Sequence, residues 1–147
     1  MDEMKIKNEI FEKIKKGLFE EAAQFDECDT DKIIKQIHDE SFDQQNLTFY
    51  CFTIFMYKRT NNIDWLELAV DILCFSINWM EGAYAMALYH QREILEQNRN
   101  VENLQMMLFF YRVPDVDFEE EEAKKIAKEI LELDPQNKIV KDIFPNL

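Results

Sequence analysis

The chain has 147 residues, enough for one domain to bury most of its apolar surface without disulfide bonds or metal ions. It contains only two glycines and three prolines, so few positions can take the positive φ angles of tight hairpins, and helices are favoured over sheet. With 17 basic and 30 acidic residues the net charge is −13, which disfavours direct contact with nucleic acid or an anionic membrane and would attract a basic protein.

The cysteines, the N-terminal segment and the apolar runs predict a cytoplasmic protein. Cys28, Cys51 and Cys74 are odd in number and form no C-x-x-C pair, so we expect reduced, mostly buried thiols. The N-terminal segment alternates charged residues with isoleucines and lacks the apolar core of a signal peptide. The longest apolar runs, 49–57 and 65–77, are shorter than the ~20 residues of a membrane-spanning helix.

The first half of the chain predicts four helices. Apolar residues recur at steps of three and four in the first two, which indicates amphipathic helices with one apolar face. The third is almost entirely apolar and should be central, and the fourth opens on a capping-box pattern, Asp64 with Glu67. The expected spans are 4–25, 31–41, 46–58 and 64–77.

The second half predicts three further helices and a short terminal one. Pro114 ends the second of these, and Asp117 with Glu120 forms another capping-box pair that opens the third. Pro135 ends that helix in turn, because proline cannot continue one. The expected spans are 79–97, 101–112, 117–133 and 138–144.

The order of these helices indicates how they pack. The nearly all-apolar helices lie mid-chain, whereas the first and seventh have one apolar stripe and one charged face. This layout is typical of a helical solenoid with polar caps, and a compact helical bundle is the alternative. In either arrangement we expect residues 1–147 to form a single all-helical domain.

An internal repeat supports the solenoid. Phe-Met-Tyr-Lys at 55–58 aligns with Phe-Phe-Tyr-Arg at 109–112, at an offset of 54 residues. With a shift of one residue in the loop, the helices that follow align as well. The aligned pairs are Val70 with Ala123, Leu73 with Ile126, Cys74 with Ala127, and Ile77 with Ile130.

The later copy resembles the second helix of a tetratricopeptide repeat. Small residues at Ala123 and Ala127, an apolar one at Ile130 and a proline at Pro135 keep the spacing of that family. The resemblance implies an array of helical hairpins. Bulky Tyr57 and Tyr111 replace the small residues of the first helices, and an offset of 54 in place of about 34 adds a helix. We therefore predict an irregular tetratricopeptide-like array of about seven or eight helices.

No catalytic, cofactor or metal site is predicted, which leaves an enzyme as the distant alternative. The only histidines are His38 and His90, and neither has the companions that a metal site needs. Cys51 and Cys74 sit in apolar runs that raise a thiol pKa. Two glycines cannot build a phosphate-binding loop.

An acidic run and the tyrosines are the candidate protein-binding features. Six carboxylates fall within residues 115–122, and they could attract a basic partner or only complement a helix N-terminus. Tyrosine suits interfaces because its ring buries area while its hydroxyl stays hydrogen-bonded, although core packing is its commoner role. The predicted partner-binding residues are Tyr57, Tyr84, Tyr89, Tyr111, Asp115, Asp117, Glu119, Glu120, Glu121 and Glu122.

Size, acidity and the lack of catalytic residues predict a non-enzymatic binding protein. In these general properties the chain resembles small acidic immunity proteins, which neutralise basic bacterial toxins by charge complementarity. The resemblance implies a basic protein toxin as the partner. The alternative is a helical-repeat adaptor that holds a peptide in an apolar groove.

Overall fold

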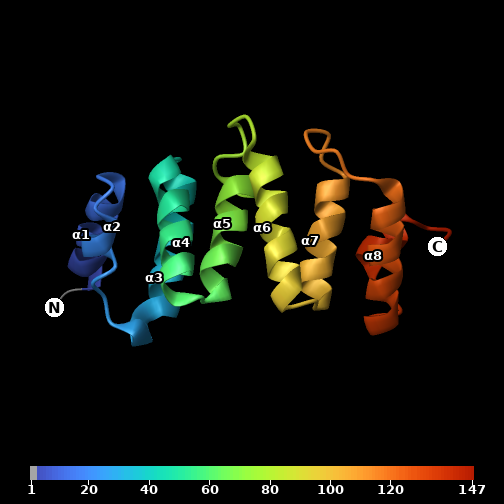
Figure 1. Cartoon of the computed structure of the whole chain (residues 1–147), viewed down its shortest axis with the longest axis horizontal. Helices are drawn as coiled ribbons and strands as arrows, with labels where there is room; N and C mark the ends of the chain where they lie inside the picture. The colour runs from blue at the N-terminus through green and yellow to red at the C-terminus, as the bar shows by residue number, and fades with distance from the viewer. Residues whose placement is uncertain (1–2) are drawn as a thin grey trace. The chain divides into compact units, whose positions relative to one another are not determined.

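The computed structural model describes residues 3–147, and within them every regular element is a helix (Figure 1). A single 3-10 helix, η1, spans Glu27–Asp29. The α-helices are α1 (Glu3–Lys15), α2 (Phe19–Ala22), α3 (Thr30–Asp43), α4 (Leu47–Thr60), α5 (Ile63–Phe75), α6 (Ala83–Gln97), α7 (Val101–Tyr111), α8 (Glu120–Leu133) and α9 (Lys138–Ile143). The prediction of an all-α fold is confirmed.

The residues group into two compact units, one ending at Ala83 and the other spanning Tyr84–Leu147. Unit 1 contains the helices up to α5, and unit 2 contains α6 to α9. We describe each unit by itself. The expectation that both belong to one domain stays a prediction.

A glycine divides the first predicted helix, so the span 4–25 is wrong. Gly17 has φ 76°, a left-handed conformation that an L side chain rarely adopts. Its N–H donates to the Ile14 carbonyl at 2.9 Å, and the Leu18 N–H donates to the Lys13 carbonyl at 2.9 Å. These two bonds form a Schellman cap that ends α1 and leaves α2 as a separate short helix.

The α4–α5 hairpin forms the centre of unit 1, and α1 and α3 pack against it. Its core is aromatic: the rings of Phe11 and Phe49 meet edge to face at 5.9 Å, and those of Phe52 and Trp65 at 5.8 Å. Edge-to-face pairs add to the free energy of area burial. The nearly all-apolar α4 still has half-buried positions, since only Phe49, Phe52, Thr53 and Met56 are buried.

Asparagines, and not the predicted Asp64–Glu67 pair, form the turn of this hairpin. Asn61 ends α4 in the left-handed conformation, with φ 57°. The side chain of Asn62 then accepts a hydrogen bond from the Asp64 N–H at 3.0 Å and caps α5. Helix α5 therefore starts one residue before the predicted box, and Asp64 stands in its first turn.

The predicted helix 79–97 also starts too early. Residues 76–82 form a turn, in which Gly82 has φ 89° directly before the first residue of α6. A left-handed residue cannot continue into a right-handed helix, so α6 begins at Ala83. Trp79 is left in the turn with 66% of its surface exposed.

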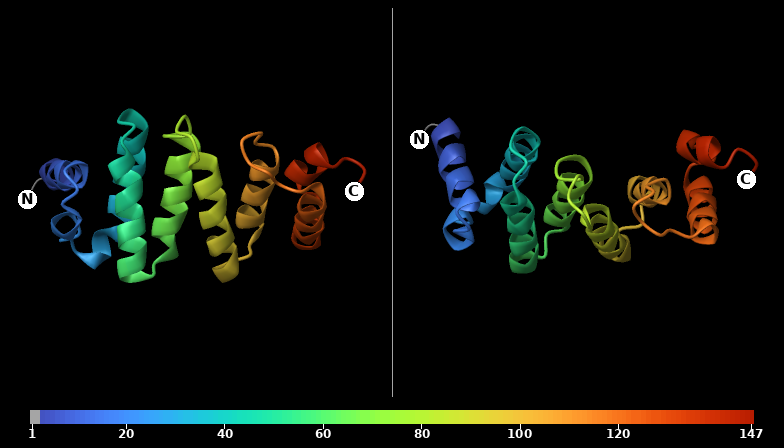
Figure 2. Two further views of the ribbon diagram at one scale, coloured as in Figure 1. Left: turned by 45° about the horizontal axis from the view of Figure 1, so that its top comes forward. Right: turned by 90° about the horizontal axis from the view of Figure 1, so that it is seen from above.

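Unit 2 is built around the α7–α8 hairpin, which lies beside α6 in Figure 1 and in both views of Figure 2. Leu104, Met107 and Leu108 of α7 pack with Ala123, Ile126, Ala127 and Ile130 of α8. The small alanines let the two helices approach closely. Glu119, and not Asp117, precedes α8, and its side chain makes no capping hydrogen bond, so the predicted capping box is wrong.

Each copy of the internal repeat contains a helical hairpin, α4–α5 in unit 1 and α7–α8 in unit 2, although two residues join the first pair of helices and eight join the second. Residues 55–58 and 109–112 share the same sequence of half-buried, buried, half-buried and exposed side chains. All eight aligned residues of the following segments are buried. Asn46 and Asn100, also 54 residues apart, cap the first helix of each hairpin. The repeat therefore begins at the capping asparagine, about two helical turns before the aligned segments 55–58 and 109–112.

Candidate binding surfaces

The predicted tyrosines differ in what they contact. Tyr111 stacks on the Phe144 ring at 5.6 Å and meets Phe118 edge to face at 6.1 Å. Tyr84 lies 6.2 Å from the Phe109 ring, and Tyr57 in the other unit is half-buried. These three contribute to packing within their own units. Tyr89 on α6 is 61% exposed, and it remains the best placed of the four to meet a partner.

The predicted acidic run divides into a loop and the start of a helix. Asp115, Asp117 and Glu119 are exposed in the segment between α7 and α8. Glu120, Glu121 and Glu122 occupy the first turn of α8, where negative charge complements the helix dipole. Glu120 also pairs with Lys124, one turn along, at 3.5 Å. A structural role therefore explains the helical half of the run.

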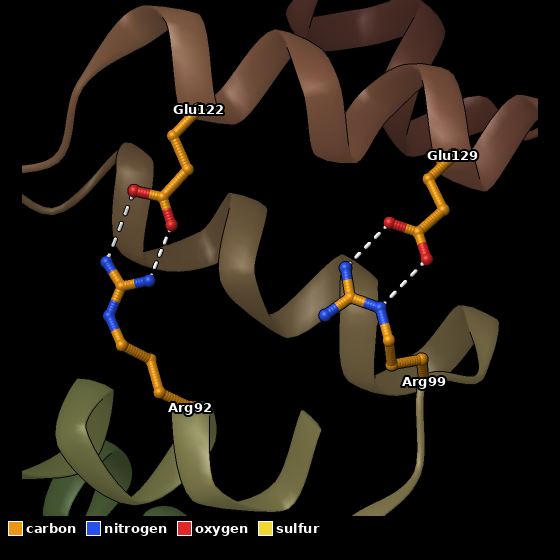
Figure 3. A network of polar contacts seen from close by, with 4 residues as sticks. All are labelled: Arg92, Arg99, Glu122 and Glu129. Carbon is orange, nitrogen blue, oxygen red and sulfur yellow. Dashed lines mark hydrogen bonds and ion pairs between the residues drawn. The ribbon is translucent and has the colours of Figure 1, made fainter. Parts of the chain in front are cut away.

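Two arginine–glutamate pairs link α6 and the loop that follows it to α8, and we call them the α6–α8 clasp (Figure 3). Arg92 makes a bidentate contact with Glu122, whose second bond is 3.3 Å. Seven residues after Arg92, in the loop that follows α6, Arg99 donates from Nε and Nη2 to Glu129 of α8 at 2.9 and 2.7 Å. The hydrogen bonds from Arg99 lower the pKa of Glu129. Glu122 is thus already paired with a cation of its own unit.

Unit 1 contains an acidic groove that the sequence reasoning missed. It has a volume of about 480 Å³ and lies between α3 and α5. Five carboxylates line it, with two cationic or titratable groups and two apolar side chains. The lining residues are Asp31, Asp39, Asp64, Glu67, Asp71, Lys35, His38, Ile34 and Leu68.

Helical spacing explains why these carboxylates meet. Asp64, Glu67 and Asp71 are the only charged residues of α5, and steps of three and four place them on one face. On α3, Asp31, Lys35 and the adjacent pair His38 and Asp39 recur at the same spacing. Packing of α3 on α5 brings the two faces together.

The charged forms of two carboxylates in the groove are disfavoured. Burial raises the pKa of Asp71, and the nearby His38 offsets part of this rise. Burial also raises the pKa of Glu67, as do the charges of Asp64 and Asp71. His38 lies 3.7 Å from Asp71 through Nε2 and 3.7 Å from Asp39 through Nδ1. Since desolvation and mutual repulsion disfavour the carboxylates, a cation entering the groove would stabilise them.

The sequence contains a signal for this groove. The charged residues of α5, at 64, 67 and 71, all lie on one face of an otherwise apolar helix. A face of this kind does not pack into the hydrophobic core. The capping interpretation assigned Asp64 and Glu67 to the helix start, and it left Asp71 unexplained. The facing residues on α3 lie 25 to 40 residues earlier in the chain, so periodicity within one helix could not find them.

His90 and the three cysteines differ in burial. His90 is buried and contacts Glu93 on its own helix at 3.0 Å. Cys28 is exposed, Cys51 half-buried and Cys74 buried, so the expectation of mostly buried thiols holds fully only for Cys74, where burial raises the pKa to about 12. Within residues 3–147, no three His, Cys, Asp or Glu side chains are placed to hold a metal ion.

Among the described helices, none is long and apolar enough to cross a membrane. Comparisons of the chain with protein-family models, with curated proteins and with solved structures give no match.

Proposed function

We propose that this chain is a non-enzymatic binding protein that captures a basic protein partner in the acidic groove. Its most concrete form is an immunity-type inhibitor that neutralises a basic protein toxin. The groove carries the proposal, because five carboxylates line it beside only Lys35 and His38, and burial raises the pKa of two of these carboxylates.

The groove suits a lysine or arginine side chain of the partner. Its apolar residues, Ile34 and Leu68, can contact the aliphatic stem of such a side chain. Its carboxylates can then pair with the ammonium or guanidinium head. Arginine would gain most, since its planar group can bind a carboxylate through two parallel hydrogen bonds.

Charge also supports rapid capture. The chain carries −13 in total, and its field would steer a basic protein toward the groove. Steering of this kind raises association rates more than it raises affinity. An inhibitor of a toxin benefits from fast association.

Peptide binding in an apolar groove is the second candidate, and Tyr89 is the observation that favours it. This ring is 61% exposed on α6, close to the 43% exposed Met86 one turn before it. An aromatic and a methionine side chain on one helical face are frequent features of protein interfaces. An adaptor of this kind would bind independently of salt.

Affinity capture with two matched variants tests the proposal. The groove variant Asp64→Asn/Glu67→Gln/Asp71→Asn and the loop variant Asp115→Asn/Asp117→Asn/Glu119→Gln each remove three negative charges. We expect the tagged wild-type chain to recover one stoichiometric basic protein from native lysate, identified by mass spectrometry. The groove variant should lose it, and the loop variant should retain it.

Three other results would contradict the proposal. Recovery of no basic protein would count against a charge-selected partner. Equal recovery by the wild type and the groove variant would exclude the groove. Loss in the loop variant alone would return the acidic run to the role that the sequence first indicated.

A further inference from the structure

The α6–α8 clasp borders a cavity of unit 2 that the proposed function does not use. This cavity has a volume of about 400 Å³, and Figure 3 shows the two arginine–glutamate pairs beside each other at its rim. Its apolar side chains belong to the hydrophobic core of the unit, and they are Leu95, Met107 and Ile126. Its charged side chains are Arg92, Arg99, Lys125, Glu96, Glu122 and Glu129. The cavity therefore reaches from a charged rim to the core.

The charges that line the cavity balance. Three of the side chains are cations and three are carboxylates, and the clasp accounts for two of each. A ligand with a net negative charge would be repelled by the field of a chain that carries −13. A ligand with a net positive charge would meet no surplus of carboxylates here. A ligand of zero net charge fits this cavity best.

One acid and one base of the cavity are left outside the clasp. Glu96 stands one turn after Arg92 on α6, and Lys125 stands between Glu122 and Glu129 on α8, so helical spacing places each on the face that carries the clasp. Both are exposed, and within the described part of the chain neither makes a hydrogen bond or an ion pair. They offer the cavity a free carboxylate and a free ammonium group.

Arg99 adds a further free donor to the same cavity. Its Nε and Nη2 atoms bind Glu129 at 2.9 and 2.7 Å, which leaves Nη1 outside both bonds. In Figure 3 this third nitrogen lies on the side of the guanidinium that faces Arg92, toward the space between the two pairs. A carboxylate in the cavity can therefore accept from Nη1 while the pair with Glu129 stays intact.

We propose that the cavity binds a free α-amino acid with an apolar side chain, in its zwitterionic form. The ligand carboxylate accepts hydrogen bonds from Lys125 and Arg99, and the ligand ammonium group donates to Glu96. The ligand side chain packs on the three apolar residues of the cavity. A segment within a peptide has no terminal charges in its backbone and would leave Glu96 and Lys125 without partners. This site belongs to unit 2, and its ligand is independent of what the acidic groove binds.

Four matched probes test this inference by nuclear magnetic resonance titration of the full chain. L-leucine has both charges and an apolar side chain. N-acetyl-L-leucine keeps only the carboxylate, L-leucinamide keeps only the ammonium group, and glycine lacks the side chain. We expect L-leucine to shift backbone amides of residues 92–99 and 122–129, and to bind roughly 10-fold or more tightly than each other probe, since each lacks one of the three contacts.

Two substitutions assign the charges of the ligand to residues of the cavity. Glu96→Gln should abolish the preference for L-leucine over N-acetyl-L-leucine, and Lys125→Gln should reduce the preference over L-leucinamide. A purely structural role of either residue would not change this selectivity. Lys128→Gln is the control, because it removes the same charge as Lys125→Gln from an exposed position of α8 outside the cavity. It should leave both preferences intact.

Three results would overturn the inference. If L-leucine shifts no amide of the cavity, the cavity holds only solvent. If N-acetyl-L-leucine or L-leucinamide binds as tightly as L-leucine, one of the two charges is not recognised and the ligand is not a zwitterion. If Lys128→Gln weakens binding as much as Lys125→Gln, net charge and not the cavity attracts the probe. None of these results bears on the acidic groove, so the proposed function would stand.

Discussion

At the scale of single residues, the structure shows a conflict between stability and the use proposed for the groove. Asp71 and Glu67 stand where burial raises their pKa, so their charged forms lower the stability of the folded chain. A residue selected only for stability would be neutral there. Carboxylates at such positions are typical of sites that bind a ligand.

The substitution Asp71→Asn should therefore stabilise the protein at neutral pH. The raised pKa means that the folded chain keeps its proton to higher pH than the unfolded chain, so the penalty is absent below the unfolded value near 3.8 and complete above the folded value. Because 46% of the Asp71 side chain is exposed, solvent screens part of this cost, and we expect urea denaturation at pH 7 to show a gain of at most about 0.5 kcal/mol, shrinking toward zero as the pH falls below about 4.

Asp39→Asn is the control for that measurement. Its side chain lines the same groove but is 66% exposed, so burial imposes little cost on its charge. We expect unchanged stability for this variant. A loss of stability in Asp71→Asn at pH 7 would show that its contact with His38 outweighs the cost of burial.

At the scale of helices, sequence periodicity predicted the bounds of those helices whose ends depend on the neighbouring sequence alone. Helices α4 and α7 lie within two residues of their predicted bounds, because capping asparagines and dense apolar runs define them. The two largest errors fall at Gly17 and Gly82, where a left-handed residue interrupts an apolar pattern that continues across it. Periodicity does not reveal the sign of φ.

The candidate site was harder to predict because it depends on packing between helices. The acidic run of residues 115–122 is visible in the sequence, yet the structure pairs Glu122 with Arg92 on another helix. The acidic groove is scattered over α3 and α5, and it exists only because these helices pack together. Neither pairing could be read from the spacing within one helix.

The α6–α8 clasp makes a modest contribution to unit 2. Its four side chains are 35–51% exposed, and solvent screens exposed ion pairs to about 0.2–1 kcal/mol each. We expect Arg92→Gln/Arg99→Gln to increase amide hydrogen exchange in α8 by a few-fold at low salt. The increase should shrink in high salt, which already screens the wild-type pairs.

Lys125→Gln, which removes one positive charge where the double variant removes two, is the control for the clasp. Lys125 is exposed on α8 and lines the same cavity as both arginines. It should leave exchange in α8 nearly unchanged. Equal effects of Lys125→Gln and the double variant would mean that net charge, and not the two pairs, sets the stability of α8.

At the scale of the whole molecule, negative charge is the property that connects composition with the proposed function. Both units are acidic, and the acidic groove of unit 1 concentrates that charge over a small apolar floor. A diffuse acidic surface would attract any basic protein, whereas a groove with fixed carboxylates can select one. The central claim is therefore that association depends on charge and that the groove is where this dependence arises.

The association rate of the captured basic protein, measured from about 20 mM to about 500 mM NaCl, tests this claim most directly. For the wild-type chain we expect the rate to fall by roughly 10-fold or more, as for other electrostatically steered pairs. Asp64→Asn/Glu67→Gln/Asp71→Asn should lose most of this dependence, and Asp115→Asn/Asp117→Asn/Glu119→Gln should keep it. A rate that does not change with salt, or a groove variant with the same salt dependence as the wild type, would contradict the account.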